Sequence, residues 1–324
     1  MNKEIMIGNH KISEDSPTFV IAEMSANHLM DFDRAVAIMQ AAKDAGADAI
    51  KIQTYTPDTI TLDCDDPCFQ ITQGTIWDGT TLHKLYETAY TPWEWQPKLK
   101  KIAEEMGLVF FSSPFDLTSI DFLEEMEVPV YKVASFEIND IPFIRKIART
   151  GKPIIMSTGI AYLADIELAL RTCKEEGNEN VILLKCTSAY PAPYEDINLK
   201  TIPSMKEVFD CVVGLSDHTM CRGRCRRGAG SQGGGETSDP AQSRRRCGCG
   251  ILHGTGRIQR DGGSHPHDRE SSRKGDLRSD TEAEKEQRTF PFPVRGTGYE
   301  GRGCVYSGES AVCETFLRTA YQIL

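Results

Sequence analysis

Short runs of β-branched and other apolar residues alternate, along the first 220 residues, with longer segments in which apolar residues recur at helical spacing. Because the short runs are apolar throughout, they are typical of parallel strands buried on both faces by helices. The runs predict seven strands, at residues 18–23, 48–55, 108–114, 129–135, 153–159, 181–188 and 211–218. The clearest of the helices between them are predicted at residues 34–47, 119–128, 142–151 and 164–177.

Seven strand-helix units in succession predict an α/β fold of the (β/α)8 TIM-barrel type. The pattern stops at residue 220, and residues 221–324 are rich in Arg, Gly and Ser without apolar periodicity. We therefore expect residues 1–220 to form a barrel domain that is truncated after its seventh strand. We expect residues 221–324 to be an aberrant, disordered tail.

The charge divides at the same place. Residues 1–220 hold 19 basic and 34 acidic residues, whereas residues 221–324 hold 18 and 13, and 16 of those 18 are Arg. The acidic domain, with no apolar run long enough to cross a membrane and no leader-like start, favours a cytoplasmic protein without nucleic-acid or membrane partners. Its scattered cysteines are typical of reduced thiols.

Polar residues stand at the end of every predicted strand, where the chemistry of parallel barrels is found. They are Glu23, Lys51, Gln53, Ser112, Ser113, Lys132, Ser135, Glu137, Ser157, Thr158, Lys185, Thr187, Ser188, Ser216, Asp217 and His218. Three lysines among hydroxyl groups predict an electropositive pocket for a phosphate or a carboxylate. The alternative is that each lysine only pairs with Glu23 or Glu137. His218 is a candidate nitrogen ligand for a divalent cation, although one histidine is not a metal site.

Seven motifs occur in this order: IAEMSANH, GADAIKIQTYTPD, FSSPFDLTSIDFLEE, YKVASFEI, GKPIIMSTGI, LLKCTSAYPAPYEDINL and VVGLSDHTM. In sequence and spacing they resemble the sialic acid synthase family over residues 5–220. The stretches IKIQTYTPDTITL and WDGTTLHKLYETAYTPWEW resemble its pseudaminic acid synthase branch. Leu29 and Met30 depart from the family's pattern, which has small residues after the Asn27-His28 pair.

The resemblance implies a metal-dependent condensation of phosphoenolpyruvate with 2,4-diacetamido-2,4,6-trideoxy-altrose, giving a nonulosonic acid and phosphate by C–O cleavage. The metal is Mn, Mg or Co, polarises the sugar aldehyde, and has His218 as one of two histidine ligands. Glu137 is implied in proton transfer, and Tyr190 and Phe115 in contacts with the sugar. The phosphate and carboxylate are held by Lys51, Lys132, Ser135, Ser157, Ser188 and Ser216, with support from Glu23 and Gln53. Asn27 belongs to a matching motif.

In this family the chain continues with an eighth strand carrying the second histidine, a linker, and an antifreeze-like domain used in a homodimer. Residues 221–324 show none of this as written. Read one nucleotide downstream, residues 245–262 and 285–315 can spell patterned sequence that resembles the missing continuation. We infer an out-of-frame translation from about residue 221, which the coding DNA sequence tests, and expect feeble activity.

Three other functions stay open. The chain could be an N-acetylneuraminate or legionaminate synthase, which differs only in the sugar. It could be an aldolase on the same barrel that uses a lysine as nucleophile. Its Arg-rich tail could instead bind nucleic acid, although no aromatic residues for base stacking are interleaved with its Arg clusters.

Overall fold

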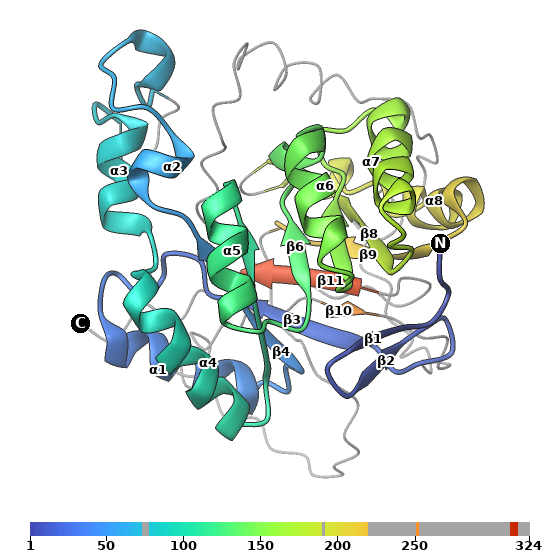
Figure 1. Cartoon of the computed structure of the whole chain (residues 1–324). Helices are drawn as coiled ribbons and strands as arrows, with labels where there is room; N and C mark the ends of the chain where they lie inside the picture. The colour runs from blue at the N-terminus through green and yellow to red at the C-terminus, as the bar shows by residue number, and fades with distance from the viewer. Residues whose placement is uncertain (73–77, 190–191, 220–250, 253–311, 317–324) are drawn as a thin grey trace, which may run out of the picture.

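In a computed structural model, the chain is described over residues 1–72, 78–189, 192–219, 251–252 and 312–316. Seven consecutive parallel strands curve into a barrel, and helices surround it (Figure 1). The strands are β3 (Phe19–Glu23), β4 (Ala49–Thr54), β5 (Val109–Pro114), β6 (Tyr131–Val133), β7 (Ile154–Ser157), β8 (Val181–Cys186) and β9 (Val212–Ser216). Each overlaps a predicted run, so the fold class and the strand order are confirmed.

The eighth place in the ring is occupied by a strand from beyond residue 220. Strand β11 (Val312–Phe316) pairs in parallel with both β3 and β9, and β10 (Ile251–Leu252) pairs antiparallel to β11 beside it. The sequence predicts a barrel left open after the seventh strand, whereas these pairings close it. Of the segment 221–324, for which the sequence predicts disorder, the structure describes these two strands, and the rest lies outside the described residues.

Helices fill the connections between strands, and the four predicted ones are all present. The helices are α1 (Phe32–Asp44), α2 (Pro57–Ile60), α3 (Leu82–Ala89), α4 (Gln96–Glu105), α5 (Leu117–Glu125), α6 (Ile141–Arg149), α7 (Leu163–Glu175) and α8 (Thr201–Phe209). Short 3-10 turns are η1 (Pro67–Phe69), η2 (Trp93–Trp95), η3 (Ser135–Glu137) and η4 (Tyr194–Asp196). Figure 1 shows α2 and α3 side by side in an excursion between β4 and β5. Among the described helices, none combines the length and the apolar character needed to cross a bilayer.

Two hydrophobic layers share the strands. Alternate side chains such as Ile21, Phe111 and Ile155 fill the barrel interior, while their neighbours pack outward against the helices. The hairpin of β1 (Ile5–Ile7) and β2 (His10–Ile12), which the sequence pattern did not predict, adds its isoleucines to the interior layer. It covers the barrel where the strands begin and leaves their carboxyl ends open for chemistry.

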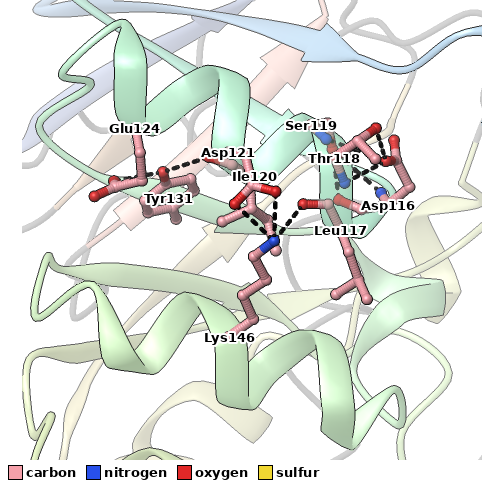
Figure 2. Close-up of polar contacts among 9 residues, drawn as sticks. All are labelled: Asp116, Leu117, Thr118, Ser119, Ile120, Asp121, Glu124, Tyr131 and Lys146. Carbon is pink, nitrogen blue, oxygen red and sulfur yellow. Dashed lines mark hydrogen bonds and ion pairs between the residues drawn. The ribbon is translucent and has the colours of Figure 1, made fainter.

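Helix α5 begins at a capping residue that fixes how it leaves β5. The Asp116 carboxylate accepts from the backbone N–H groups of Thr118 and Ser119 at 2.7 and 3.1 Å, as Figure 2 shows. Ser119 completes the capping box, because its hydroxyl accepts from the Asp116 N–H at 3.2 Å. Such a cap contributes about 1 kcal/mol to the helix.

The other end of Figure 2 shows how α5 is tied to its neighbours. Lys146 of α6 donates to the Leu117 carbonyl at 2.8 Å and pairs with Asp121 at 2.7 Å. Tyr131 of β6 donates its hydroxyl to Glu124 at 2.6 Å. These contacts join β6 to α5 and α5 to α6. They thereby fix the strand that carries Lys132, the residue after Tyr131.

The loop after β3 holds non-glycine residues in left-handed conformation. Ser25, Leu29 and Met30 have φ angles of 49°, 49° and 58°. This left-handed conformation costs an L-residue about 1–2 kcal/mol. Buried His28 supports it, since its Nδ1 accepts from the Met30 N–H at 3.1 Å. Its Nε2 therefore carries the proton and donates to Thr91 Oγ1 at 3.2 Å. A neutral imidazole thus holds the loop at Leu29 and Met30.

This loop makes folding sensitive to acid. Burial, reinforced by the nearby Arg34 guanidinium, lowers the pKa of His28 from 6.5 to about 4. The unfolded chain therefore takes up a proton on His28 below pH 6.5, whereas the folded chain takes it up only near pH 4. The contribution of His28 to the free energy of unfolding is thus intact above pH 6.5 and is lost as the pH falls from 6.5 to 4. Relative to a His28→Gln variant, the free energy of unfolding of the wild type should fall by about 3 kcal/mol from pH 7 to pH 4. Urea titrations across this range measure it, and parallel curves for the two proteins would contradict the assignment.

Candidate active site at the carboxyl ends of the strands

Strand alternation decides which polar side chains enter the barrel. In β4, Ala49 belongs to the interior layer, so Lys51 and Gln53 share its inward parity. In the other strands too, every second residue after an interior residue points inward, up to the carboxyl end of the strand. The inward polar positions are Glu23, Lys51, Gln53, Ser113, Lys132, Ser157, Cys186 and Ser216. One end of the barrel is therefore lined by charged and hydroxyl groups, as predicted for the strand ends.

Glu23 and Lys51 form an ion pair across the β3–β4 contact. Their Cα atoms are direct partners in the parallel register, and the Lys51 ammonium touches a Glu23 carboxylate oxygen. The side chains are 0% and 4% exposed. Lys51 also donates to Ser113 Oγ at 3.3 Å. Part of the alternative interpretation thus holds, since Lys51 has a local acidic partner, and both residues of the pair occupy inward positions at the strand ends.

Lys132 is buried on β6 and binds oxygen atoms. Its ammonium donates to Ser157 Oγ and to the Val133 carbonyl, both at 2.7 Å. With the lysine as donor, Ser157 keeps its own proton to donate. The Lys132–Ser157 pair therefore presents positive charge and a hydroxyl donor together, which suits an anionic oxygen.

Ser135 and Ser188 lie beside each other although 53 residues separate them. The Ser188 hydroxyl donates to Ser135 Oγ at 2.9 Å, and the Ile160 N–H donates to the same oxygen at 3.0 Å. Both residues are buried, at 5% and 7% exposure. The ends of β6, β7 and β8 meet at this point.

Glu137 lies in the 3-10 turn η3, which Ser135 begins. Its side chain is buried, at 2% exposure. The turn follows β6 after one residue, so Glu137 lies in the same connection as Ser135 and five residues after Lys132. A carboxyl group shielded from bulk water suits proton transfer better than an exposed one.

His218 has the hydrogen bonding of a metal ligand. Its Nδ1 donates to the Thr187 carbonyl at 2.8 Å, which leaves the Nε2 lone pair to accept or to coordinate. The Ser216 hydroxyl is 3.5 Å from Nε2, and Cys186 Sγ is 3.7 Å from Nδ1. In the parts of the chain that the structure describes, no three His, Cys, Asp or Glu residues are grouped to hold a metal ion.

Lys185 does not join the pocket as the predicted ring of three lysines requires. It shares the outward parity of Leu183, and its ammonium donates to the Cys186 carbonyl and to Thr187 Oγ1, at 2.8 and 3.0 Å. The interior position nearby belongs to Cys186, which the pattern of polar strand ends did not indicate. Counting residues from Leu184 along the strand would have found it.

The remaining candidates have other placements. Phe115 packs in an aromatic cluster with Tyr55 and Tyr86, its ring 5.5 Å from that of Tyr55. Asn27 holds the first loop, because its amide donates to the Met24 carbonyl at 2.8 Å. Tyr190 lies outside the described residues. The sugar contacts expected of Phe115 and Tyr190 stay predictions.

The buried ion pair yields a stability prediction. Lys51→Met would leave the Glu23 carboxylate buried without its cation and should lower the free energy of unfolding by about 3–5 kcal/mol. Glu23→Gln combined with Lys51→Met removes both charges and should recover most of that loss. Urea unfolding of the wild type, the two single variants and the double variant measures the coupling; additive losses would contradict a direct pairing.

Comparison with known proteins relates this chain to a family. The model of the NeuB family matches residues 38–234. The pseudaminic acid synthase of Campylobacter jejuni subsp. jejuni serotype O:23/36 (strain 81-176) is 49% identical over 216 residues, which is 67% of this chain and 62% of that protein. The N,N'-diacetyllegionaminic acid synthase of C. jejuni serotype O:2 (strain ATCC 700819 / NCTC 11168) is 36% identical over 205 residues, covering 62% of this chain and 61% of that protein.

A solved structure agrees with the sequence relatives. The N-acetylneuraminic acid (sialic acid) synthetase of Leptospira borgpetersenii serovar Hardjo-bovis, determined with citrate, superposes with a TM-score of 0.60 at 31% identity. The match covers 68% of this chain and 71% of that one. The chain thus spans about three fifths of the length of the first curated relative. The expected family resemblance is confirmed, since the family model matches more than half of the 324 residues: this chain belongs to the NeuB family.

Proposed function

We propose that this chain is a pseudaminic acid synthase, condensing phosphoenolpyruvate with 2,4-diacetamido-2,4,6-trideoxy-altrose to a nonulosonic acid and phosphate. The observation that carries the proposal is the buried Lys132–Ser157 pair beside the Ser135–Ser188 pair, at the open end of the barrel. Together these groups present a positive charge and hydroxyl donors to an anionic substrate. Phosphoenolpyruvate carries a phosphate and a carboxylate that need such partners.

The reaction joins C3 of phosphoenolpyruvate to the aldehyde carbon of the sugar. Water then adds to C2, and the bond between C2 and the bridging oxygen breaks to release phosphate. Lys132, Ser135 and Ser157 hold anionic oxygens, which keeps the phosphate in place until it leaves. Ser188 and Ser216 stand beside this group, at their own strand ends.

Lys51 contributes to the same open end from β4, where Glu23 of β3 is its ion-pair partner. Gln53 lies two residues further along β4. Glu137 orients the substrate and transfers a proton, for which its buried carboxyl group is suited. Excluding water from these charged groups strengthens each electrostatic contact.

A divalent cation, Mn, Mg or Co, fits the site in part. His218 offers Nε2 as a nitrogen ligand, with Nδ1 held by a backbone carbonyl as in many metal-bound histidines. The remaining ligands would come from outside the described residues and from the substrates. A bound cation supplies Lewis acidity toward the aldehyde oxygen.

The pseudaminic branch is favoured over its alternatives by the higher identity to the pseudaminic acid synthase, 49% against 36% for the legionaminic acid synthase. The aldolase alternative requires a lysine free to attack a carbonyl, whereas Lys51 is ion-paired and Lys132 donates to two oxygens. We place the protein in the cytoplasm, where phosphoenolpyruvate is made, and propose a homodimer as the family assembly. Residues 221–324 remain proposed as out-of-frame, and turnover by the chain as written should be low.

A labelled substrate tests the reaction. The full chain is incubated with Mn²⁺, the sugar and phosphoenolpyruvate carrying ¹⁸O in the bridging position, and the products are analysed by mass spectrometry. C–O cleavage places the label in inorganic phosphate, and a nonulosonic acid of the expected mass appears in equal amount. Lys132→Met should abolish both products, because it removes the cation from the anion site.

The opposite results are distinct. Label retained in an organic product, or no sugar-dependent product above the Lys132→Met control, would contradict the proposal. Borohydride trapping of a covalent lysine adduct would instead support the aldolase alternative.

A further inference from the structure

Gly159, in the connection between β7 and α7, lies unusually close to the serine pair. A Cβ atom built on it would be 2.1 Å from Ser188 Oγ, 2.7 Å from Ser135 Oγ and 3.2 Å from Cys186 Sγ. Contacts below 3.0 Å are not tolerated by carbon atoms without movement. Any other residue at this position would displace at least one serine hydroxyl.

Conformational freedom does not explain this glycine. The glycines with positive φ angles include its neighbours along the chain Gly151 and Gly177, but not Gly159. Its backbone conformation is therefore open to any L-residue, and only the space that a side chain would occupy requires glycine.

The close approach determines how Ser135 can use its hydroxyl. A serine hydroxyl has one proton and two acceptor lone pairs. The lone pairs of Ser135 receive the Ile160 N–H at 3.0 Å and the Ser188 hydroxyl at 2.9 Å. Within the described residues no acceptor is recorded for its proton, which is therefore available to a ligand.

We propose that Gly159 is a positioning residue that makes Ser135 an obligate hydrogen-bond donor to an anionic oxygen of the substrate. The missing side chain lets the Gly159–Ile160 backbone lie against the serine pair, so that Ile160 and Ser188 fill the acceptor sites of Ser135. This inference rests on the proposed function, because it deepens the account of the phosphoenolpyruvate site.

The chemical consequence is selectivity for acceptors. A phosphate or carboxylate oxygen can receive the Ser135 proton, whereas a ligand group that only donates meets a hydroxyl with both lone pairs in use. Ser157 accepts one hydrogen bond, from the Lys132 ammonium at 2.7 Å, and also keeps its proton to donate. Gly159 controls the other donor, the Ser135 hydroxyl.

A double-mutant cycle tests this coupling in the full chain. Phosphoenolpyruvate binding is measured by titration calorimetry for the wild type, Gly159→Ala, Ser188→Ala and the double variant. The added methyl group should weaken binding about tenfold or more, because a hydrogen bond to a charged group is disrupted. Ser188→Ala removes the nearest obstacle, so the double variant should bind more tightly than Gly159→Ala alone.

Gly151→Ala is the matched control for general damage. Gly151 has a φ of 72°, and among the described residues no atom lies within 4 Å of where its methyl group would stand, so alanine there introduces strain away from the serine pair. It should lower the melting temperature while leaving phosphoenolpyruvate affinity unchanged. Gly159→Ala should instead lose phosphoenolpyruvate affinity, and this loss should be larger than any decrease in its melting temperature explains.

Each contrary result has a definite meaning. Wild-type affinity in Gly159→Ala, or losses that add in the double variant, would overturn the role of Gly159 while leaving the proposed function intact. Absence of phosphoenolpyruvate binding in the wild type would overturn both. Weakened binding with rescue by Ser188→Ala supports the proposal.

Discussion

The rest of this structure depends on one constraint, the parallel pairing of the seven successive strands from β3 through β9. It brings seven carboxyl ends to one rim, and strand alternation then sends every second side chain into the interior. Charges that enter such an interior need partners, since desolvating an ion costs several kcal/mol. Glu23 with Lys51, and Ser157 with Lys132, are those partners. The requirement for compensation therefore already organises the pocket.

Lys51 and Lys132 both hold neighbouring groups at the strand ends. Lys51 pairs with the Glu23 carboxylate. Lys132 donates to the Ser157 hydroxyl and to a backbone carbonyl, both at 2.7 Å, and these contacts orient its ammonium. Ser157, which accepts from this ammonium, keeps a proton that it can donate to a ligand. The proposed anion site therefore lies on the Lys132 side, next to Ser135 and Ser188.

Much of this was predictable from the sequence because burial on both faces leaves an unmistakable apolar run. All seven strands, and the side chains at their ends, follow from that pattern. Lys185 was misplaced because residue type alone does not reveal parity, whereas counting from Leu184 does. The role of Gly159 could not be recognised from the sequence, because Gly159, Ser135 and Ser188 follow three different strands and only the fold brings them together. The β1–β2 hairpin has strands of three residues, too short to show a period.

The central claim is that Lys132, Ser135 and Ser157 bind the anionic oxygens of phosphoenolpyruvate at the open end of the barrel. A crystal structure of the full chain grown with phosphoenolpyruvate tests it most directly. We predict density for the ligand with phosphate or carboxylate oxygens within hydrogen-bond distance of the Lys132 ammonium and of both hydroxyl groups. Ligand bound elsewhere at saturating concentration, with the Lys132–Ser157 and Ser135–Ser188 contacts unchanged and facing no ligand atom, would contradict it.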